Sequence, residues 1–364
     1  MTIGIDGNEA NVEKKVGVSN YTYHMLLYFN EVASEKKQFV VFLRDDPRND
    51  LPKENRYFKY KVIKAKFLWR DVFLPLSLYR KKHIDLFFSP AHYTPRFCPV
   101  PIVVTIHDVS YIHFPDEFLE KDLYKLTHWT AHAVTQARKI IAVSESTKKD
   151  IIAHYHISKN NINVIYNGYE KYTPSIKKDS SLYSLPQGPY FLYVGTIQPR
   201  KNIKRLIEAF GKLLKKHPNY KLVIVGKKGW LYGDIFDKAL ELGLEDSVIF
   251  SGYVSNEQLS RLYKNALCCV VPSLYEGFGL PVLESMGQNC PVIASNISSI
   301  PEVGGKACLY FNPYDEEELE KAMIKVATNE KLHKELVEKG KQRVKEFSWE
   351  KCAKETLAVL ESAI

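Results

Sequence analysis

The 364-residue sequence lacks the signatures of several protein classes. No apolar run approaches the ~18–20 residues of a transmembrane helix, and no basic region followed by an apolar one opens the N-terminus, so no spanning segment or secretory signal is predicted. Six scattered cysteines form no Cys-x-x-Cys pair and have no histidine cluster beside them. This argues against a zinc site and favours reduced thiols. We therefore expect a cytoplasmic protein without a bound metal, whose membrane contact would be peripheral.

Several nucleotide- and nucleic-acid-binding strings are also missing. There is no G-x-G-x-x-G, no P-loop G-x-x-x-x-G-K-[ST] and no Asp-x-Asp. No RNP, KH or helix-turn-helix string accompanies the basic composition, so we predict no nucleic-acid partner. Neither a short repeat nor a long low-complexity segment is present, which argues against solenoid and disordered classes.

What is present is an ordinary globular composition, with 45% hydrophobic and 26% charged residues, in a length that allows two domains. Lys plus Arg (51) exceeds Asp plus Glu (42), which gives a net charge of +9. This charge suits an anionic partner, such as a phosphate group or a membrane surface.

Short apolar segments alternate with longer amphipathic ones, which predicts an α/β fold. Most short segments are apolar on both faces, as buried parallel strands are. The segment 203–217 has apolar residues at helical spacing and follows Asn202, a predicted N-cap. The predicted strands are Val40–Leu43, Leu86–Ser89, Ile102–Ile106, Ile140–Val143, Phe191–Val194, Lys221–Val225, Ser247–Phe250, Leu267–Val271, Pro291–Ala294 and Cys308–Phe311.

The alternation pauses between about Tyr169 and Pro189, where a polar, proline-containing stretch is the best candidate for a domain linker. After Asn312 no strand is predicted, and a charged stretch, Asp315–Glu320, opens a helical tail that runs to Ile364. Open parallel sheets bind ligands beyond the carboxyl ends of their strands, so functional residues are expected there.

The strongest motif is YEGFGLPVLE at 275–284, between a predicted strand and an apolar helix. Its glycines let backbone approach a ligand closely, and the helix N-terminus suits an anion or a hydroxyl-rich group. Glu276 lies in the loop, and Glu284 lies in the first helical turns. Taken alone, Glu284 is equally explained as an acid that complements the helix dipole.

The second motif, GTIQPRKN at 195–202, directly follows the strand Phe191–Val194. Arg200 can grip a phosphate bidentately and Lys201 adds a point charge before the next helix begins. A solvated basic turn is the alternative interpretation.

Two weaker motifs follow strands earlier in the chain. His107-Asp108 comes straight after Ile102–Ile106, where a histidine can donate a hydrogen bond, shuttle a proton or serve only the structure. Gly17-Val18-Ser19-Asn20 follows the first strand, and its glycine could lie under a phosphate.

Together these strings resemble family 4 of the retaining glycosyltransferases, which use nucleotide sugars and have the GT-B fold. The resemblance is to mannosyltransferase-like, group 1 members, and spans nearly the whole chain in order. It is carried by the Gly17 loop, His107-Asp108 and the segments 142–146, 164–168, 195–202, 252–254, 276–284 and 300–303.

The resemblance implies two Rossmann-like domains that face each other across a cleft. Residues 1–170, with a final helix at 348–364 that crosses back, would form an N-terminal acceptor-binding domain. Residues 171–188 would be the linker, and 189–347 the nucleotide-sugar-binding domain. Trp349, Leu357, Val359 and Leu360 are the predicted anchors of the returning helix.

The resemblance also implies a role for each matched residue. Arg200 and Lys201 would bind the donor diphosphate and stabilise the leaving nucleotide, and Glu284 would hold the ribose. His107 would contact the donor sugar near its reacting centre. The remaining donor contacts would come from Gly17, Gly195, the backbone around Tyr253 and Val254, and Glu276 with Gly277, Phe278, Gly279 and Leu280. His107, Glu276, Arg200 and Lys201 are the implied catalytic residues.

The resemblance leaves the sugar and base open. GDP-mannose is favoured over a UDP-sugar, with no cofactor and no metal. Many family members carry an arginine where this chain has Thr196, so the phosphate grip would rely more on Arg200.

A basic, aromatic segment lies at 56–82. It contains nine Lys or Arg residues (Arg56, Lys59, Lys61, Lys64, Lys66, Arg70, Arg80, Lys81 and Lys82) against Asp71, and aromatic residues are interleaved. One interpretation is a face that docks on anionic lipid or guides a lipid-linked acceptor. The other is a solvated strand pair with a core-packed helix, in which Phe67, Trp69 and Leu74 are buried.

The favoured function is a retaining glycosyltransferase of surface polysaccharide or glycolipid synthesis. The alternatives are a non-catalytic bilobal nucleotide-sugar binding protein, a sugar-nucleotide epimerase of the same fold, and a phosphorylase, which would need lysine-bound pyridoxal phosphate.

Overall fold

The computed structural model describes residues 1–80, 83–170 and 186–364, which form two compact units. Unit 1 contains Met1–Pro115, Glu120–Gly168 and Phe347–Ile364. Unit 2 contains Asp116–Leu119 and Tyr169–Glu346. Most of the predicted linker, including 171–185, lies outside the described residues.

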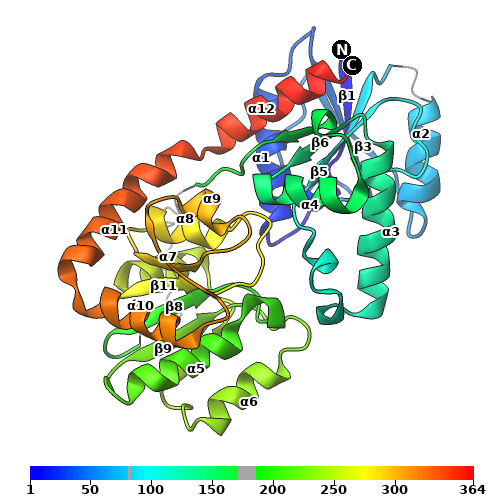
Figure 1. Cartoon of the computed structure of the whole chain (residues 1–364). Coiled ribbons are helices and arrows are strands. Elements are labelled where there is room, and N and C mark those ends of the chain that lie inside the picture. Colours follow the sequence, from blue (N-terminus) through cyan, green and yellow to red (C-terminus); the bar gives the residue numbers. More distant parts are fainter. Residues whose placement is uncertain (81–82, 171–185) are drawn as a thin grey trace. The chain divides into compact units, whose positions relative to one another are not determined.

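A parallel sheet of seven strands in the order β3-β2-β1-β4-β5-β6-β7 forms the centre of unit 1 (Figure 1). Its inner strands are apolar on both faces and buried, which is what helices on both sides of a parallel sheet require. The strands are β1 (Thr2–Asp6), β2 (Gln38–Leu43), β3 (Phe58–Val62), β4 (Leu86–Ser89), β5 (Ile102–Ile106), β6 (Lys139–Ala142) and β7 (Ile162–Val164).

Helices connect these strands, and one segment has an unusual form. The π-helical turn η2 (Trp69–Phe73) runs directly into α2 (Leu74–Arg80) and is preceded by Leu68, whose φ is 54°. The other helices of unit 1 are η1 (Asn8–Ala10), α1 (Val18–Glu31), η3 (Ser110–Ile112), α3 (Glu120–Gln136), α4 (Glu145–Tyr155), η5 (Lys159–Asn161) and α12 (Trp349–Ser362). The turn η4 (Pro115–Glu117) leads from unit 1 into the segment grouped with unit 2.

The C-terminal helix α12 packs in unit 1 beside α1, and both chain termini lie there together (Figure 1). The Trp349 ring stacks on His24, with 4.6 Å between ring centroids. Leu357, Val359 and Leu360 enter the core that also contains β1 and α1, and Trp349 packs against it. The four predicted anchors of this helix are therefore confirmed as core contacts.

Unit 2 has a parallel sheet of six strands in the order β10-β9-β8-β11-β12-β13. Counted from its own first strand, this is the 3-2-1-4-5-6 order of a doubly wound Rossmann sheet, and unit 1 repeats the same order with one more strand. The strands are β8 (Tyr190–Val194), β9 (Lys221–Val225), β10 (Val248–Gly252), β11 (Cys268–Val271), β12 (Val292–Ser295) and β13 (Cys308–Phe311).

The core of unit 2 lies largely between this sheet, α5 and α10, and includes Phe191, Phe210 and Met323. Asp315 caps α10 through its side chain, and α10, α11 and α12 lie in the predicted helical tail. The helices of unit 2 are η6 (Pro199–Lys201), α5 (Ile203–Leu214), α6 (Gly233–Glu241), α7 (Asn256–Asn265), α8 (Leu280–Gly287), α9 (Ile300–Gly304), α10 (Glu316–Thr328), α11 (Glu330–Arg343) and η7 (Val344–Glu346).

All ten predicted strands are present, and four of them (β4, β5, β9 and β13) have the predicted bounds. A first strand before Gly17 was expected without bounds, and it is β1. The prediction missed β3, whose lysines alternate with apolar residues, and the three-residue β7. Asn202 occupies the N-cap position of α5, as predicted, but its side chain does not cap the helix. Its φ is 57°, and its Oδ1 accepts from Arg205 Nη1 rather than from a backbone amide of the helix, while its Nδ2 donates to Pro272 O and Pro313 O.

Within the described residues, no helix is long and apolar enough to cross a membrane. The same residues contain no group of three or more His, Cys, Asp or Glu side chains that could hold a metal ion.

Candidate functional site

The two strongest motifs meet at the topological switch point of unit 2. Strands β8 and β11 are neighbours in the sheet, and the strand order reverses between them. The loop after β8 carries 195–202, and the loop after β11 carries 272–279. In doubly wound sheets, a crevice for ligands opens at this position beyond the carboxyl ends of the strands.

Backbone and side-chain hydrogen bonds join these two loops. The Leu274 amide donates to Arg200 O over 2.8 Å, and Arg200 Nη1 donates to Tyr275 O over 3.0 Å. The buried Asn202 amide adds the contacts to Pro272 and Pro313 described above. The turn that presents Arg200 and Lys201 is therefore held against the loop that presents Glu276.

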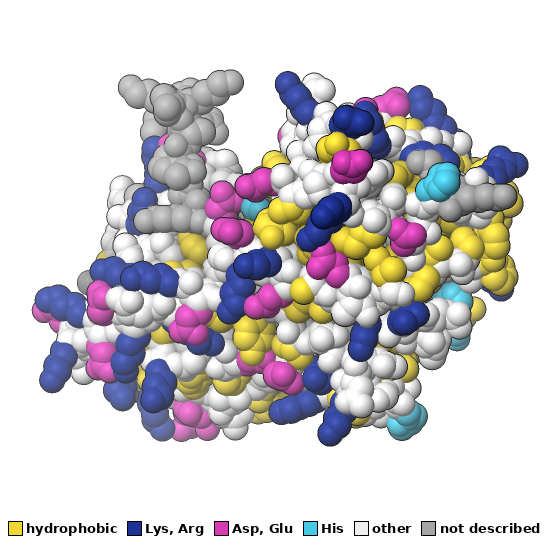
Figure 2. Space-filling view, turned by 90° about the horizontal axis from the view of Figure 1, so that it is seen from above, with side chains coloured by type: hydrophobic (Ala, Val, Ile, Leu, Met, Phe, Trp, Pro, Cys, Tyr) yellow, Lys and Arg dark blue, Asp and Glu magenta, His cyan; other side chains and the backbone are white. Residues whose placement is uncertain are grey.

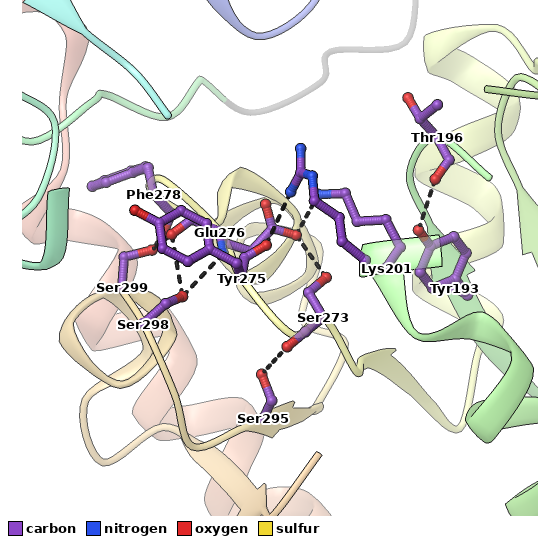
Figure 3. Close-up of polar contacts among 11 residues, drawn as sticks. Tyr193, Thr196, Lys201, Ser273, Tyr275, Glu276, Phe278, Ser295, Ser298 and Ser299 are labelled. Carbon is purple, nitrogen blue, oxygen red and sulfur yellow. Dashed lines mark hydrogen bonds and ion pairs between the residues drawn. The ribbon is translucent and has the colours of Figure 1, made fainter. Parts of the chain in front are cut away.

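Lys201 and Glu276 form an ion pair, with 2.5 Å between Nζ and Oε1 (Figure 3). Ser273 Oγ donates to the same carboxylate oxygen over 2.7 Å. The Lys201 and Glu276 side chains are only 13% and 11% exposed, so water screens their attraction weakly. The cation predicted for phosphate and the carboxylate predicted for sugar hydroxyls thus lie in direct contact.

A group of serines holds the backbone of Glu276. Ser298 Oγ accepts from Glu276 N and donates to Glu276 O, while Ser299 Oγ donates to Glu276 O and Phe278 O over 2.7 and 2.9 Å (Figure 3). Ser295 Oγ donates to Ser273 O. Ser295 ends β12, and Ser298 and Ser299 lie between that strand and the segment 300–303 that carries the family resemblance, so no motif marked them in the sequence.

Gly277, Phe278 and Gly279 lie in the loop that enters α8, and Leu280 is the first residue of that helix. Gly279 occupies the N-cap position with a φ of 103°, a conformation that L side chains rarely adopt. The glycine thus permits the sharp entry from the loop into the helix.

Glu284 lies one turn into α8, where it is half-buried. The hydroxyl of Tyr263, a fully buried residue of α7, donates to Glu284 Oε2 over 3.2 Å. The sequence analysis did not single out Tyr263, since a tyrosine at helical spacing is indistinguishable from an ordinary core residue.

The loops after β8 and β9 approach each other closely. A Cβ on Gly226 would lie 1.8 Å from Gly195 O, and the Gly195 amide donates to Val225 O. Beyond β10, Tyr253 is 48% exposed with Lys227 Nζ above its ring, while Val254 is buried. Tyr253 is thus accessible to a planar ligand, and the Val254 side chain is not.

Thr196, which stands where the family often has arginine, is exposed and its carbonyl accepts from Tyr193 Oη over 3.2 Å (Figure 3).

Unit 2 contains a further carboxylate that no sequence motif marked. Glu117 lies beside Arg200, and burial raises its pKa while the Arg200 charge lowers it. Its carbonyl accepts from Trp230 Nε1.

His107 and Gly17 belong to unit 1. Gly17 precedes α1 with φ 51° and ψ −115°, and nothing lies within 4 Å of the position its Cβ would take. His107 follows β5, where its Nε2 contacts Pro90 O at 2.7 Å and its ring lies edge-on to Tyr21.

Burial lowers the pKa of His107 to about 3, with the neighbouring His92 adding to this effect. A neutral His107 must place its proton on Nε2, because the Pro90 carbonyl can only accept. Nδ1 then carries a lone pair. Of the predicted roles, hydrogen bonding fits this environment better than proton shuttling at neutral pH.

Two doubly wound sheets, one of which carries cationic and acidic side chains at its switch point, define an α/β protein whose ligands are expected at that position. Family models for "Glycosyltransferase Family 4" and "Glycosyl transferases group 1" match residues 17–171 and 173–343. The chain belongs to glycosyltransferase family 4, and it is an enzyme of the GT-B fold.

Curated relatives include O-antigen chain mannosyltransferase B of Escherichia coli, which is 32% identical over 267 residues, covering 70% of this chain and 68% of the relative. O-antigen chain mannosyltransferase RfbU of Salmonella typhimurium is 32% identical over 222 residues, covering 60% of this chain and 59% of the relative.

Solved structures with a similar fold include a sucrose-phosphate synthase of Thermosynechococcus elongatus. Its TM-score is 0.75 at 19% identity, and the match covers 99% of this chain and 98% of that one. HepE of Anabaena, solved in complex with UDP and glucose, has a TM-score of 0.74 at 18% identity and 99% coverage of both chains.

Proposed function

We propose that this glycosyltransferase moves a mannosyl residue from a nucleoside-diphosphate mannose to a saccharide or lipid-linked acceptor in cell-surface polysaccharide or glycolipid synthesis. The meeting of Arg200, Lys201 and Glu276 at the switch point of unit 2 carries the proposal. The two mannosyltransferase relatives support mannose over other hexoses. GDP-mannose is the favoured donor, and a UDP-sugar is the alternative.

In this scheme, the donor diphosphate takes Lys201 away from Glu276 and also contacts Arg200. Glu276, held by the serines, then accepts hydrogen bonds from the sugar hydroxyls, together with the backbone of Gly277–Gly279. Glu284 accepts from the ribose. The two cations offset the charge that the diphosphate gains as it leaves, so the scheme needs no resident cofactor.

We propose retention of configuration at the anomeric carbon. The bond from C1 to the β-phosphate oxygen breaks through an oxocarbenium-like state, and the acceptor oxygen bonds to C1 on the same face. The acceptor hydroxyl passes its proton to the departing phosphate oxygen. Neutral His107 accepts a hydrogen bond from a donor-sugar hydroxyl through Nδ1, and Gly17 lies near the phosphates.

A turnover assay tests the proposal. The chain is incubated with GDP-mannose, UDP-glucose or UDP-galactose, with and without a mannose disaccharide, and product stereochemistry is read by NMR. We expect nucleotide release and an α-mannoside from GDP-mannose, lost in Lys201→Ala and kept in Lys204→Ala, an exposed lysine three residues further on. Donor binding without turnover in every combination would favour the non-catalytic binding protein, and an inverted product would refute retention.

We further propose that unit 1 docks on an anionic membrane, at the cytoplasmic face that the free cysteines favour. Six large apolar side chains are exposed along η2, α2 and the residues before them: Phe67 (74%), Leu68 (60%), Val72, Phe73, Leu76 and Tyr79. Figure 2 draws hydrophobic side chains together with Lys and Arg along its right-hand edge, the side on which Figure 1 draws α2. We call these six residues the apolar face.

The apolar face differs from both sequence interpretations. Trp69 and Leu74 are buried, as the core-packed interpretation predicts, but Phe67 is exposed. Contiguous exposed apolar residues mark interaction surfaces. The exposed Lys64 and Lys66 adjoin this face, and the charge is complementary to acidic lipid headgroups. Lys81 and Lys82, also predicted to contribute, lie outside the described residues.

Vesicle flotation tests the docking with phosphatidylcholine vesicles that contain or lack phosphatidylglycerol. Each Lys→Glu substitution changes the charge by two units. At about 1 kcal/mol per unit charge, reversing both Lys64 and Lys66 removes roughly 4 kcal/mol of attraction to the membrane. We expect this variant and Phe67→Ser/Leu68→Ser to lose flotation, while Lys36→Glu/Lys149→Glu, two exposed lysines elsewhere in unit 1, keeps it. Docking is refuted if the unaltered chain never floats with anionic vesicles.

A further inference from the structure

Unit 1 has its own topological switch point, between β1 and β4, which are neighbours in the sheet. Asp6 ends β1, and His92 and Tyr93 follow β4 in the loop before β5. This is the position that holds the pair Lys201–Glu276 in unit 2. Side chains of unit 1 with ligand-binding chemistry are therefore expected here.

Arg70 of the π-helical turn η2 reaches this switch point. Its Nη2 lies 3.7 Å from Asp6 Oδ2, and its guanidinium lies over the Tyr93 ring at 5.0 Å. Its Nε atom is buried and has no hydrogen-bond partner among the described residues. A buried donor without a partner is costly, so a ligand oxygen that accepts from Arg70 would be favoured.

The backbone around Arg70 is also unusual. π-Helical turns are rare and concentrate at functional sites. The turn follows Leu68, a non-glycine residue with a φ of 54°, a conformation that stores strain. Two residues after this position, Arg70 contacts Asp6, while Leu68 itself is exposed.

Two aromatic side chains and two carboxylates complete the cluster. The Tyr93 ring meets Trp129 of α3 edge-on at 5.2 Å, and Trp129 is 41% exposed. Burial and the Asp6 charge raise the pKa of Glu9, which lies near Asp6 and Arg70. Aromatic faces contact the apolar C–H faces of sugar rings, and carboxylates and Arg bind their hydroxyls and ring oxygens.

We propose that Asp6, Arg70, Tyr93 and Trp129 form the subsite for a neutral saccharide ring of the acceptor. The inference rests on the proposed function, which requires an acceptor but assigns it no residues. A bare phosphate fits this cluster less well than an uncharged sugar, because the Asp6 carboxylate already pairs with Arg70 and Glu9 lies beside both. The turn η2, which contains Arg70, also contains Val72 and Phe73 of the apolar face. A lipid-linked sugar can therefore reach the subsite from a membrane.

Binding and kinetics test the subsite separately. Saturation-transfer NMR of the full chain with α-mannobiose measures saccharide binding without turnover. Nucleotide release from the donor without acceptor measures the donor site. Transfer at varied α-mannobiose gives the acceptor KM. The variants are Trp129→Ala and Arg70→Gln, and Tyr124→Ala is the matched control, since Tyr124 is an exposed aromatic residue of the same helix.

We expect Trp129→Ala and Arg70→Gln to lose NMR saturation and to raise the acceptor KM at least tenfold, with donor hydrolysis unchanged and Tyr124→Ala unaffected. Unchanged α-mannobiose binding in both variants overturns the subsite. It is also overturned if the chain binds a short-chain prenyl phosphate through Arg70 but does not bind α-mannobiose. If the chain turns over no donor yet binds α-mannobiose through Trp129, the proposed function fails and the subsite stands.

Discussion

Breaking the ion pair between Lys201 and Glu276 should lower the free energy of unfolding more than breaking an exposed ion pair such as Lys212–Glu316. At 2.5 Å and an effective dielectric constant near 20, the gross attraction is roughly 7 kcal/mol. Desolvation of two side chains that are little exposed offsets most of it. We expect Lys201→Ala and Glu276→Ala each to cost about 3 kcal/mol, and the double variant to cost about 2 kcal/mol less than their sum.

Urea denaturation of the four proteins measures this coupling. The matched control is the pair Lys212–Glu316, also in unit 2, whose 2.6 Å contact joins side chains that are 39% and 36% exposed. There the coupling should be about 0.5 kcal/mol or less, because water and salt screen it. If the Lys201 and Glu276 effects add within about 0.5 kcal/mol, the two residues are not coupled and the reasoning is wrong.

Three further outcomes are expected. Tyr263→Phe removes the hydroxyl that donates to Glu284, a hydrogen bond worth about 1 kcal/mol. Nucleoside-diphosphate binding should therefore weaken roughly fivefold in calorimetry, while binding of the 2′,3′-dideoxy analogue should stay unchanged. Gly226→Ala should lower the midpoint of thermal unfolding by several degrees, because the new Cβ would lie 1.8 Å from the backbone oxygen of Gly195. Gly233→Ala should leave the midpoint unchanged, because nothing lies within 4 Å of its Cβ position, and equal effects of the two substitutions would contradict this reasoning. The folded pKa of His107, about 3, lies below its unfolded value, so the unfolded chain takes up the proton first and stability falls as the pH drops below about 6.5. At pH 5 the loss is at most about 2 kcal/mol, and His107→Gln should reduce it in denaturation at pH 7 and pH 5.

Much of the fold was predictable because buried parallel strands are apolar on both faces. Segments such as Ile102–Ile106 and Lys221–Val225 stand out for this reason, and their predicted bounds are those of β5 and β9. The strand β3 was missed because it pairs at the edge of its sheet, where Lys59 and Lys61 are tolerated. Periodicity alone could not reveal the π-helical turn before α2.

Sequence spacing marked the candidate site as two separate loops, and only the family resemblance implied that both contact one donor. Lys201 and Glu276 lie 75 positions apart, and only the strand order that makes β8 and β11 neighbours brings them together. Their direct pairing also depends on side-chain geometry that sequence spacing does not contain. Arg70 is a similar case, since its motif was interpreted as surface charge and its guanidinium instead turns inward to Asp6.

The proposed function depends above all on donor binding by Lys201 at the switch point of unit 2. A thermal-shift screen against UDP, GDP, ADP and their sugars measures this binding. We expect a stabilising shift with one nucleotide and its sugar, GDP being favoured, and we expect Lys201→Ala to lose this shift and Lys204→Ala to retain it. A folded chain that shifts with no nucleotide, or a shift that survives Lys201→Ala unchanged, would contradict it.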